Sequence, residues 1–459
     1  KYLCLAHMSG NEQKYVQEAF DTNWVVPLGP NVNAFEEELA KFFKSKPNNT
    51  DFSAETYPKN IQAHHNNPDE LWSDEYEDLR DKQVVALCSG TAAVHLALIN
   101  LGVKTGDEVI CQSFTFCASS HPVAYLGATP VFVDSEDTTW NMSPELLEDA
   151  IKDRIEKTGK KPKAIIVVYL YGMPAKIKEI LEIANRYNIP LVEDAAEGLG
   201  SRYNGRAVGT FGEYGVMSFN GNKMITTSGG GALICPGKEA KERIMFFATQ
   251  AREAFPYYQH EEIGYNYRLS NVCAGIGRGQ MTVLDEHIAH HRHIAKLYKE
   301  GFKDIEGITF HDNPNELSDS NFWLNTITIR EDIKVIDQDK AYNKAVAGAV
   351  GGAAGVVHST GVVHTNCEPN SNVEAMRIAL DKLGIESRPL WKPMHLQPVY
   401  KNSPAYVNGV SEELFKKGLC LPSGPMISDE DAKFIIESIK AAIIFTESKR
   451  TQSYLLECL

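Results

Sequence analysis

AIIVVYL at residues 164–170 and PLVED at residues 190–194 are two apolar runs, and a stretch with helical periodicity separates them. Runs without alternating polar residues are typical of strands that are buried on both faces of a parallel sheet. Two parallel neighbours need a crossover connection, which is usually a helix. The segment 164–194 therefore predicts one β-strand–α-helix–β-strand unit.

The same alternation continues on both sides of this unit, from about residue 84 to residue 235. One predicted helix begins at Ser143-Pro144-Glu145, where a capping hydroxyl precedes a proline at the first helical position and an acid near the positive end of the dipole. This order of elements predicts an α/β fold with a mainly parallel sheet. Its predicted strands are 84–88, 108–112, 130–134, 164–170, 190–194 and 215–219.

The length of 459 residues exceeds the size at which a single hydrophobic core stops growing, so we expect two domains. Residues 271–302 predict one long helix, and two short strands with helices at 371–384 and 428–447 predict a smaller α+β domain after it. We expect an N-terminal segment plus a large domain at 1–290 and a small C-terminal domain at 291–459.

Two segments interrupt this pattern. Residues 45–80 are polar and rich in Asn, Asp, Glu and Pro, which predicts an inserted surface segment. Residues 343–364 are rich in Ala, Gly and Val and predict a loop. Neither composition indicates whether the segment touches a substrate.

The composition excludes several classes of protein. The formal charge is −14 and no dense Lys/Arg run is present, which argues against nucleic acid as a general partner. No apolar stretch of about 18 residues predicts a membrane span, and the first residues lack the basic start of a signal peptide, so we expect a cytoplasmic protein. The nine cysteines form no C-x-x-C pair, which favours reduced thiols over disulfides or a zinc site.

Three motifs carry residues suited to chemistry. Ser89-Gly90-Thr91 lies between a predicted strand and a predicted helix, where free backbone N–H groups and hydroxyls can hold a phosphate. Asp194 ends an apolar strand, at the sheet edge where ligands of α/β proteins bind. Lys223 follows another buried strand, and partial burial favours the free amine that Schiff-base formation requires.

Each motif also has a purely structural interpretation. Ser89-Gly90-Thr91 could be an ordinary helix cap, Asp194 could cap the next helix, and Lys223 could be a solvated surface lysine. The order along the chain decides between the interpretations, because a phosphate turn, aromatic Phe116, Asp194 and Lys223 follow one another. This order matches the needs of pyridoxal 5′-phosphate (PLP), in which a helix start anchors the phosphate, an aromatic ring stacks on the pyridine, an acid holds the ring nitrogen protonated and a lysine forms the Schiff base.

The motifs CSGTAAVHLAL, VEDAAEGLGS, SFNGNKMITTSGGG and GYNYRLSNVCAGIGRGQ resemble the DegT/DnrJ/EryC1/StrS family of PLP-dependent sugar aminotransferases, over residues 10 to 445. The resemblance implies PLP fold type I, like that of aspartate aminotransferase. It implies Lys223 and Asp194 as catalytic residues, and cofactor contacts from Gly90, Thr91, Phe116, Glu197, Ser218 and, from the neighbouring subunit of a homodimer, Asn266. It places Arg268 and His395 on the substrate side.

Within the family, the N-terminal stretch is similar to enzymes that aminate C4 of UDP-4-keto-6-deoxy-N-acetylhexosamines. The resemblance implies transfer of an amino group from glutamate to the C4 ketone of a nucleotide-linked 4-keto-6-deoxy sugar, for cell-surface polysaccharide or glycan synthesis. A PLP-dependent sugar dehydratase is the alternative within the fold, although such enzymes replace the lysine with histidine. A non-catalytic regulator or binding protein that retains PLP without turnover is the alternative from another functional class.

Two further patterns receive structural interpretations. Gly275-x-Gly277-x-Gly279 lies within a predicted helix rather than after a strand, so it indicates close helix packing and not a dinucleotide site. His287, His290, His291 and His293 share helical spacing, which we interpret as a solvated helix face rather than a metal site.

Overall fold

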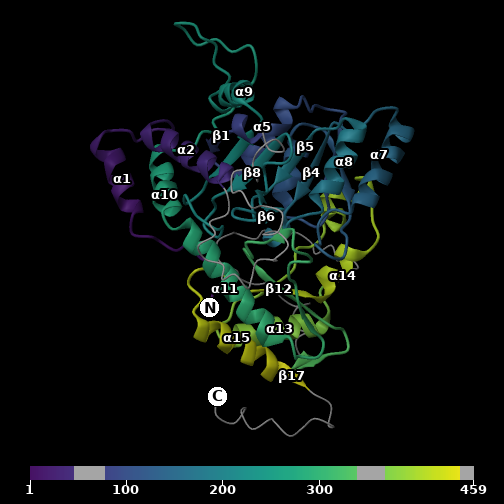
Figure 1. Cartoon of the computed structure of the whole chain (residues 1–459). Helices are drawn as coiled ribbons and strands as arrows, with labels where there is room; N and C mark the ends of the chain where they lie inside the picture. Colours follow the sequence, from purple (N-terminus) through teal and green to yellow (C-terminus); the bar gives the residue numbers. More distant parts are fainter. Residues whose placement is uncertain (46–77, 339–366, 445–459) are drawn as a thin grey trace, which may run out of the picture.

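A computed structural model describes residues 1–45, 78–338 and 367–444 of the chain (Figure 1). The interrupting segment predicted at 343–364 lies outside these residues. The segment predicted at 45–80 lies outside them apart from its two ends.

An eight-stranded mixed sheet forms the centre of the larger half of the molecule, with the strand order β1-β9-β8-β5-β4-β2-β3-β15. Only β9 runs antiparallel to its neighbours β1 and β8, and the other pairings are parallel. All six predicted strands are confirmed to within two residues at each end. The strands are β1 (Gln83–Leu87), β2 (Glu108–Gln112), β3 (Thr129–Val133), β4 (Ala164–Val168), β5 (Leu191–Asp194), β8 (Tyr214–Ser218), β9 (Gly231–Cys235) and β15 (Ala405–Tyr406).

Helices cover both faces of this sheet (Figure 1). Alternate residues of one strand enter different hydrophobic clusters: Val84 belongs to the cluster that includes residues of α2, α7 and α8, whereas Val85 belongs to the cluster that includes residues of α5, α6 and α9. Ser143 accepts a hydrogen bond from the Leu146 N–H and Pro144 begins α7, which confirms the predicted helix start. The helices are α2 (Pro30–Lys44), α5 (Gly90–Asn100), α6 (His121–Tyr125), α7 (Pro144–Thr158), α8 (Ile177–Tyr187) and α9 (Lys238–Ala248).

The single helix predicted at 271–302 is wrong, because the chain forms two helices, α10 (Asn271–Met281) and α11 (Leu284–Phe302). The break falls at Thr282 and Val283. The Thr282 hydroxyl donates to the Gly279 carbonyl oxygen, and a serine or threonine that bonds back in this way competes with the helical ladder. The spacing of apolar residues on either side of the break concealed it.

The glycines of α10 allow close packing, as predicted. A Cβ atom on Gly279 would lie 2.6 Å from the backbone nitrogen of Glu12, the first residue of α1 (Glu12–Asp21). A side chain on Gly275 would meet Tyr15 of the same helix. The backbones of α1 and α10 therefore lie in close contact, and α11 follows α10 in the chain.

A second, four-stranded sheet with the order β10-β12-β16-β14 lies beyond α11. It packs with α11, α13 and α15 around a third hydrophobic cluster, and all buried residues of this cluster lie at or after Ile294 in the sequence. This cluster supports our proposal of a domain boundary near residue 290. The elements are β10 (Ile308–Phe310), β12 (Asn325–Ile329), β14 (Arg388–Pro389), β16 (Gly418–Leu421), α13 (Ser371–Lys382) and α15 (Asp429–Ala442).

Among the described residues, none of the helices has both the length and the apolar character that crossing a bilayer requires.

Candidate functional site

Lys223 lies at the carboxyl edge of the large sheet, five residues after β8 ends. Its amino group is 3.4 Å from Glu197 Oε1 and 3.9 Å from the centre of the Trp323 ring. The lysine side chain is only 13% exposed, so both contacts are made away from bulk water. Cation–π and ion-pair contacts gain strength under such conditions. The lysine is therefore directed inward, as the sequence predicts.

Two buried acids accompany Lys223. Asp194 ends β5, and its Oδ2 accepts a hydrogen bond of 2.6 Å from the Ser119 hydroxyl. Burial raises the pKa of Asp194 against the opposing effects of Ser119 and Lys223. Burial also raises the pKa of Glu197, and the nearby Lys223 ammonium opposes this rise. Both carboxyl groups therefore gain from a cationic partner, and Lys223 acts on both.

Glu197 is held by a strained piece of backbone. Tyr171 has φ +56°, a left-handed conformation that side chains rarely adopt, and its N–H donates to Glu197 Oε2 at 2.6 Å. The Tyr171 hydroxyl in turn accepts a hydrogen bond from the Trp391 N–H. Such strain persists only where the surroundings fix it, and here it aims a donor at the acid beside Lys223.

The predicted phosphate turn lies at the same edge. Ser89 caps α5 by accepting a hydrogen bond from the Ala92 N–H, and Gly90 packs so closely that an added Cβ would lie 3.3 Å from the Ser218 Cβ. Gly231 lies directly behind the turn, where a Cβ would lie 2.4 Å from the Gly90 nitrogen. The structure thus brings Gly90, Thr91 and Ser218 together around a helix start.

Phe116 and Asn266 lie at exposed positions. Phe116 is 55% exposed, and the centre of its ring lies 6.0 Å from that of the Trp391 ring. Asn266 is exposed in the segment between α9 and α10. Both positions are accessible to a cofactor or a second subunit.

Arg268 forms a buried ion pair in this structure. Its guanidinium is buried, lies 2.7 Å from Glu36 Oε1 and donates to the Ala86 carbonyl oxygen at 3.1 Å. Glu36 also accepts from the Ala86 N–H and pairs with Lys241. The side chain therefore ties α2 to β1, and its substrate-side role stays a prediction from the resemblance.

His395 lies in a short 3-10 helix (Met394–Leu396) and contacts Ser113, the residue that follows β2. Its Nδ1 is 2.6 Å from the Ser113 hydroxyl and its Nε2 is 3.2 Å from Glu412. The side chain is 8% exposed. Protein groups therefore contact both ring nitrogens, and the substrate-side role of His395 stays a prediction.

The sequence reasoning missed three residues that contact the site: Trp323, Ser119 and Asn321. Ser119 is near Phe116 in the chain, so a search for polar partners in that motif could have found it. Asn321 donates to the Glu197 carbonyl oxygen at 2.9 Å, and Trp323 contacts Lys223. Both are about a hundred residues from their partners, and local patterns carry no signal for such contacts.

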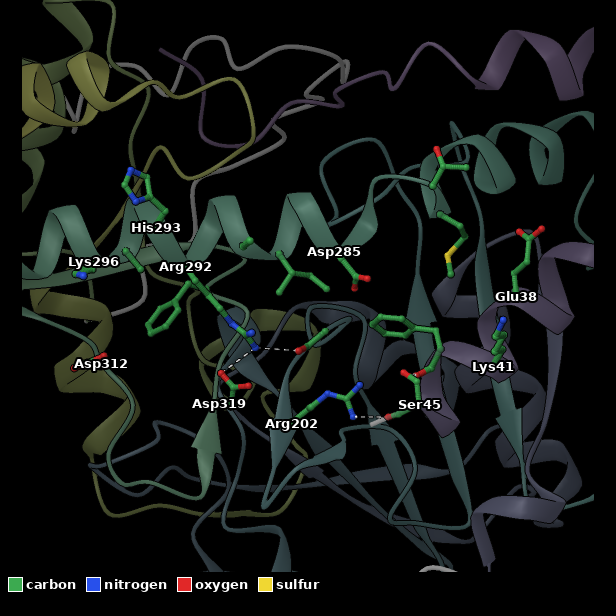
Figure 2. A pocket seen from close by; sticks show the side chains of 18 of the residues that line it. Glu38, Lys41, Ser45, Arg202, Asp285, Arg292, His293, Lys296, Asp312 and Asp319 are labelled. Carbon is green, nitrogen blue, oxygen red and sulfur yellow. Dashed lines mark hydrogen bonds and ion pairs between the residues drawn. The ribbon is translucent and has the colours of Figure 1, made fainter. Parts of the chain in front are cut away.

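A cavity of about 970 Å³ lies along another face of α11, between this helix, the end of α2 and β6 (Arg202–Tyr203) (Figure 2). None of the predicted site residues lines this cavity. Arg292, which lines the cavity, pairs with Asp319 at 2.9 Å, as Figure 2 shows. The cavity is therefore separate from the site at Lys223.

The interpretation of the four histidines of α11 as a solvated face is wrong. His287 and His291 are buried, His290 is partly buried and only His293 is exposed. The four imidazoles contact other parts of the chain, which the sequence spacing could not reveal. Their partners are the carbonyl oxygens of Met224, Ile427 and Phe322 and the side chain of Asp429. Within the described residues, no group of His, Cys, Asp and Glu side chains could hold a metal ion.

The residues present fit PLP. A helix start with a close-packed glycine turn suits a phosphate, and a buried carboxylate of raised pKa suits the protonated ring nitrogen. A sheltered lysine amine lies beside an acid. These three features correspond to the two ends and the aldehyde of the cofactor.

Comparison with known proteins identifies the family. Residues 74–351 and 344–440 match the model of the DegT/DnrJ/EryC1/StrS aminotransferase family. The chain is similar to EpsN of Bacillus subtilis (strain 168), with 41% identity over 441 residues that cover 95% of this chain and 94% of EpsN. It is also similar to the GDP-perosamine synthase of Escherichia coli O157:H7, with 31% identity over 432 residues that cover 94% and 95% of the two chains.

A solved structure agrees with this assignment. The DegT/DnrJ/EryC1/StrS aminotransferase from Brucella abortus superposes with a TM-score of 0.73 and 25% identity, covering 94% of this chain and 95% of that one. The expected α/β fold of PLP-dependent aminotransferases is confirmed. The chain belongs to the DegT/DnrJ/EryC1/StrS aminotransferase family and is a PLP-dependent aminotransferase.

Proposed function

We propose that this protein is a sugar aminotransferase that moves an amino group from an amino acid, glutamate, to the C4 ketone of a nucleotide-linked 4-keto-6-deoxy sugar, for polysaccharide or glycan synthesis. The observation that carries the proposal is the sheltered Lys223 amino group between Glu197 and Trp323. An amine in this position can both hold a carbonyl cofactor and move a proton once it is released.

Each residue of the site receives one role. Bound PLP supplies an electron sink for the charge left when the substrate Cα loses its proton. The N–H groups at the start of α5, with Thr91 and Ser218, hold the phosphate. Asp194 holds a proton on the ring nitrogen, and the Ser119 hydroxyl fixes the orientation of that carboxylate. Lys223 Nζ would take the proton from the donor Cα and deliver it to the cofactor, while Glu197 keeps the amine in place.

The names of relatives support a nucleotide-linked sugar as the amino acceptor. Three GDP-perosamine synthases are 28–31% identical to this chain. A UDP-N-acetyl-3-dehydro-α-D-glucosamine 3-aminotransferase from Acidithiobacillus ferrooxidans is 37% identical over 216 residues. These relatives differ in nucleotide and in the named carbon, so the choice of C4 rests on the resemblance of the N-terminal stretch.

The dehydratase alternative is disfavoured by the residue at position 223. Related dehydratases have a histidine there, and an imidazole cannot form a Schiff base with an aldehyde as a primary amine does. This chain has a lysine in contact with an acid and an aromatic ring. A primary amine at this position can hold the cofactor as a Schiff base between turnovers, which favours amino transfer over the dehydratase alternative.

The experiment is a pair of half-reactions with the purified full-length chain. Glutamate alone should convert the bound cofactor to its amine form, seen as loss of its visible absorbance, with release of 2-oxoglutarate. A GDP- or UDP-linked 4-keto-6-deoxy sugar should then restore the absorbance and yield an amino sugar by mass spectrometry. A product that has lost water without gaining nitrogen would indicate the dehydratase, and no reaction with any donor would favour the regulator.

Lys223→Ala and Lys223→Arg are the matched variants. We expect both to lose turnover, because arginine keeps the positive charge and its contact with Glu197 but cannot form a Schiff base. Lys440→Ala, at an exposed lysine of α15, is the control and should leave turnover unchanged. Steady-state transamination by Lys223→Ala near the wild-type rate would overturn the assignment of this residue.

We also propose that the protein is a homodimer in which Asn266 reaches the phosphate of the neighbouring subunit. Asn266 is exposed, and it follows an arm at residues 252–263 that extends from the body of the protein between α9 and α10 (Figure 1). Tyr258 and Ile263 of the arm are 78% and 84% exposed. Large apolar side chains at such exposure are typical of surfaces that bind another chain.

A mixture of two inactive variants tests the shared site. Lys223→Ala and Asn266→Ala chains, coexpressed, form some dimers in which one site contains an intact lysine and receives Asn266 from the other chain. We expect such mixtures to regain turnover that neither variant has alone. A monomer by light scattering, or no recovery in purified mixed dimers, would contradict the proposal.

A further inference from the structure

The backbone on each side of Lys223 is fixed by groups from distant parts of the chain. The carbonyl oxygen of Asn222 accepts a hydrogen bond of 2.7 Å from Trp323 Nε1. The carbonyl oxygen of Met224 lies 3.2 Å from His287 Nδ1, on α11. The lysine therefore stands between two anchored carbonyl groups, one tied to the segment just before β12 and one tied to α11.

Trp323 is itself anchored to α11 through its neighbour. The Phe322 carbonyl oxygen lies 3.1 Å from His291 Nδ1. Phe322 has φ +50°, so this backbone needs contacts that hold it in a sparsely populated conformation. Asn321 supplies another contact, because its Oδ1 accepts from the Trp323 N–H at 2.8 Å.

The two histidines occupy the same face of α11, since they are four residues apart. A carbonyl oxygen can only accept, so each imidazole carries its proton on Nδ1. The Nε2 atoms of both rings are buried and have no hydrogen-bond partner among the described residues. Burial lowers the pKa of His287 and lowers that of His291 to about 3. Both rings are therefore neutral donors near neutral pH.

We propose that His287 and His291 are positioning residues, which hold the Met224 and Phe322 carbonyl groups on α11 and thereby fix the Lys223 amino group against Trp323. This inference rests on the proposed role of Lys223. His287 acts on the lysine through the next residue of the chain, and His291 acts through the ring that covers the ammonium group. Neither histidine touches the reacting atoms.

The chain offers a matched control on the same helix. His290 Nε2 lies 2.9 Å from the Ile427 carbonyl oxygen, so it makes the same kind of bond to a carbonyl that does not adjoin Lys223 or Trp323. His287→Phe and His291→Phe remove the donor and keep an aromatic ring. His287→Asn and His291→Asn keep a donor near the Nδ1 position. His290→Phe tests whether loss of any such bond on α11 is sufficient.

The first measurement is made on the full-length chain freed of cofactor. Lysines are methylated with formaldehyde and cyanoborohydride, and peptide mapping gives the rate at Lys223 relative to the exposed Lys440. Loss of a hydrogen bond to a buried carbonyl makes local opening about tenfold more frequent, equivalent to about 1.4 kcal/mol. We expect the Phe variants to raise the relative rate by about this factor, and the Asn variants and His290→Phe to leave it near the wild-type value.

The second measurement is the rate at which PLP becomes attached to Lys223, trapped with borohydride and located by peptide mapping. We expect the Phe variants to slow attachment and the Asn variants to restore it. Equal methylation of Lys223 in wild type, His287→Phe and His291→Phe would overturn the inference, and so would an equal change in His290→Phe. Attachment of PLP to another lysine in the wild-type chain would instead overturn the proposed function, while the methylation result would stand.

Discussion

Arg268→Met removes one half of a buried ion pair and keeps most of the side-chain volume. The side chains of Arg268 and Glu36 are 5% and 7% exposed, and their charged atoms lie 2.7 Å apart. Breaking a buried pair on one side costs about 3–5 kcal/mol, because it leaves an uncompensated charge. Glu36 keeps the Ala86 N–H at 2.9 Å and Lys241 at 2.8 Å. We therefore expect the lower value, about 3 kcal/mol.

The assay is urea unfolding at pH 7 and a fixed chain concentration, followed by circular dichroism. A loss of about 3 kcal/mol changes the folding equilibrium by about two orders of magnitude. Lys440→Met, which breaks an exposed pair with Glu437, is the control and should cost less than about 1 kcal/mol. Glu36→Gln in the Arg268→Met background should recover part of the loss, because it removes the stranded charge and keeps an acceptor for Ala86.

Two results would refute this reasoning about Arg268. One is an unfolding midpoint for Arg268→Met that matches the midpoint of Lys440→Met. The other is an unchanged midpoint together with a raised KM for one substrate, which would return Arg268 to the substrate side that the resemblance implies.

Three further changes test the site and the packing beneath it. Gly231→Ala should weaken PLP binding in a fluorescence titration, since the added Cβ would lie 2.4 Å from the Gly90 nitrogen, and unchanged affinity would contradict the close approach. Asp194→Asn should stabilise the cofactor-free chain more at pH 8 than at pH 4. The pKa of Asp194 is raised above 3.8 in the folded chain, so the wild type loses stability as the pH rises from 3.8 through the pKa of the folded state, and the Asn variant does not. A thermal-unfolding difference that does not grow with pH would contradict the buried, ionising carboxyl. Gly279→Ala should cost about 1–3 kcal/mol in urea unfolding, because its Cβ would lie 2.6 Å from the Glu12 backbone, and a neutral effect would show that α1 can move away.

The strands and the order of the site motifs could be predicted from the sequence because they depend on local patterns. Buried parallel strands need continuous apolar runs, so β2 (Glu108–Gln112) was predicted at its observed ends. Asp194 and Lys223 each follow such a run, and strand ends meet at one edge of the sheet. The helix break at Thr282 was missed, because apolar spacing continues across it and the competing side-chain bond is local and weak.

The sequence by itself determined the α/β fold, the family resemblance and the lysine that is directed inward. Only the tertiary structure decided that Trp323 covers this lysine, that Arg268 is committed to Glu36 and that two histidines of α11 are buried donors. Strand and turn patterns repeat over a few residues, so a single segment reveals them. The partners of a buried charge or donor are chosen by packing between segments that lie from 31 to 232 residues apart in these examples, and only the folded chain brings those segments together.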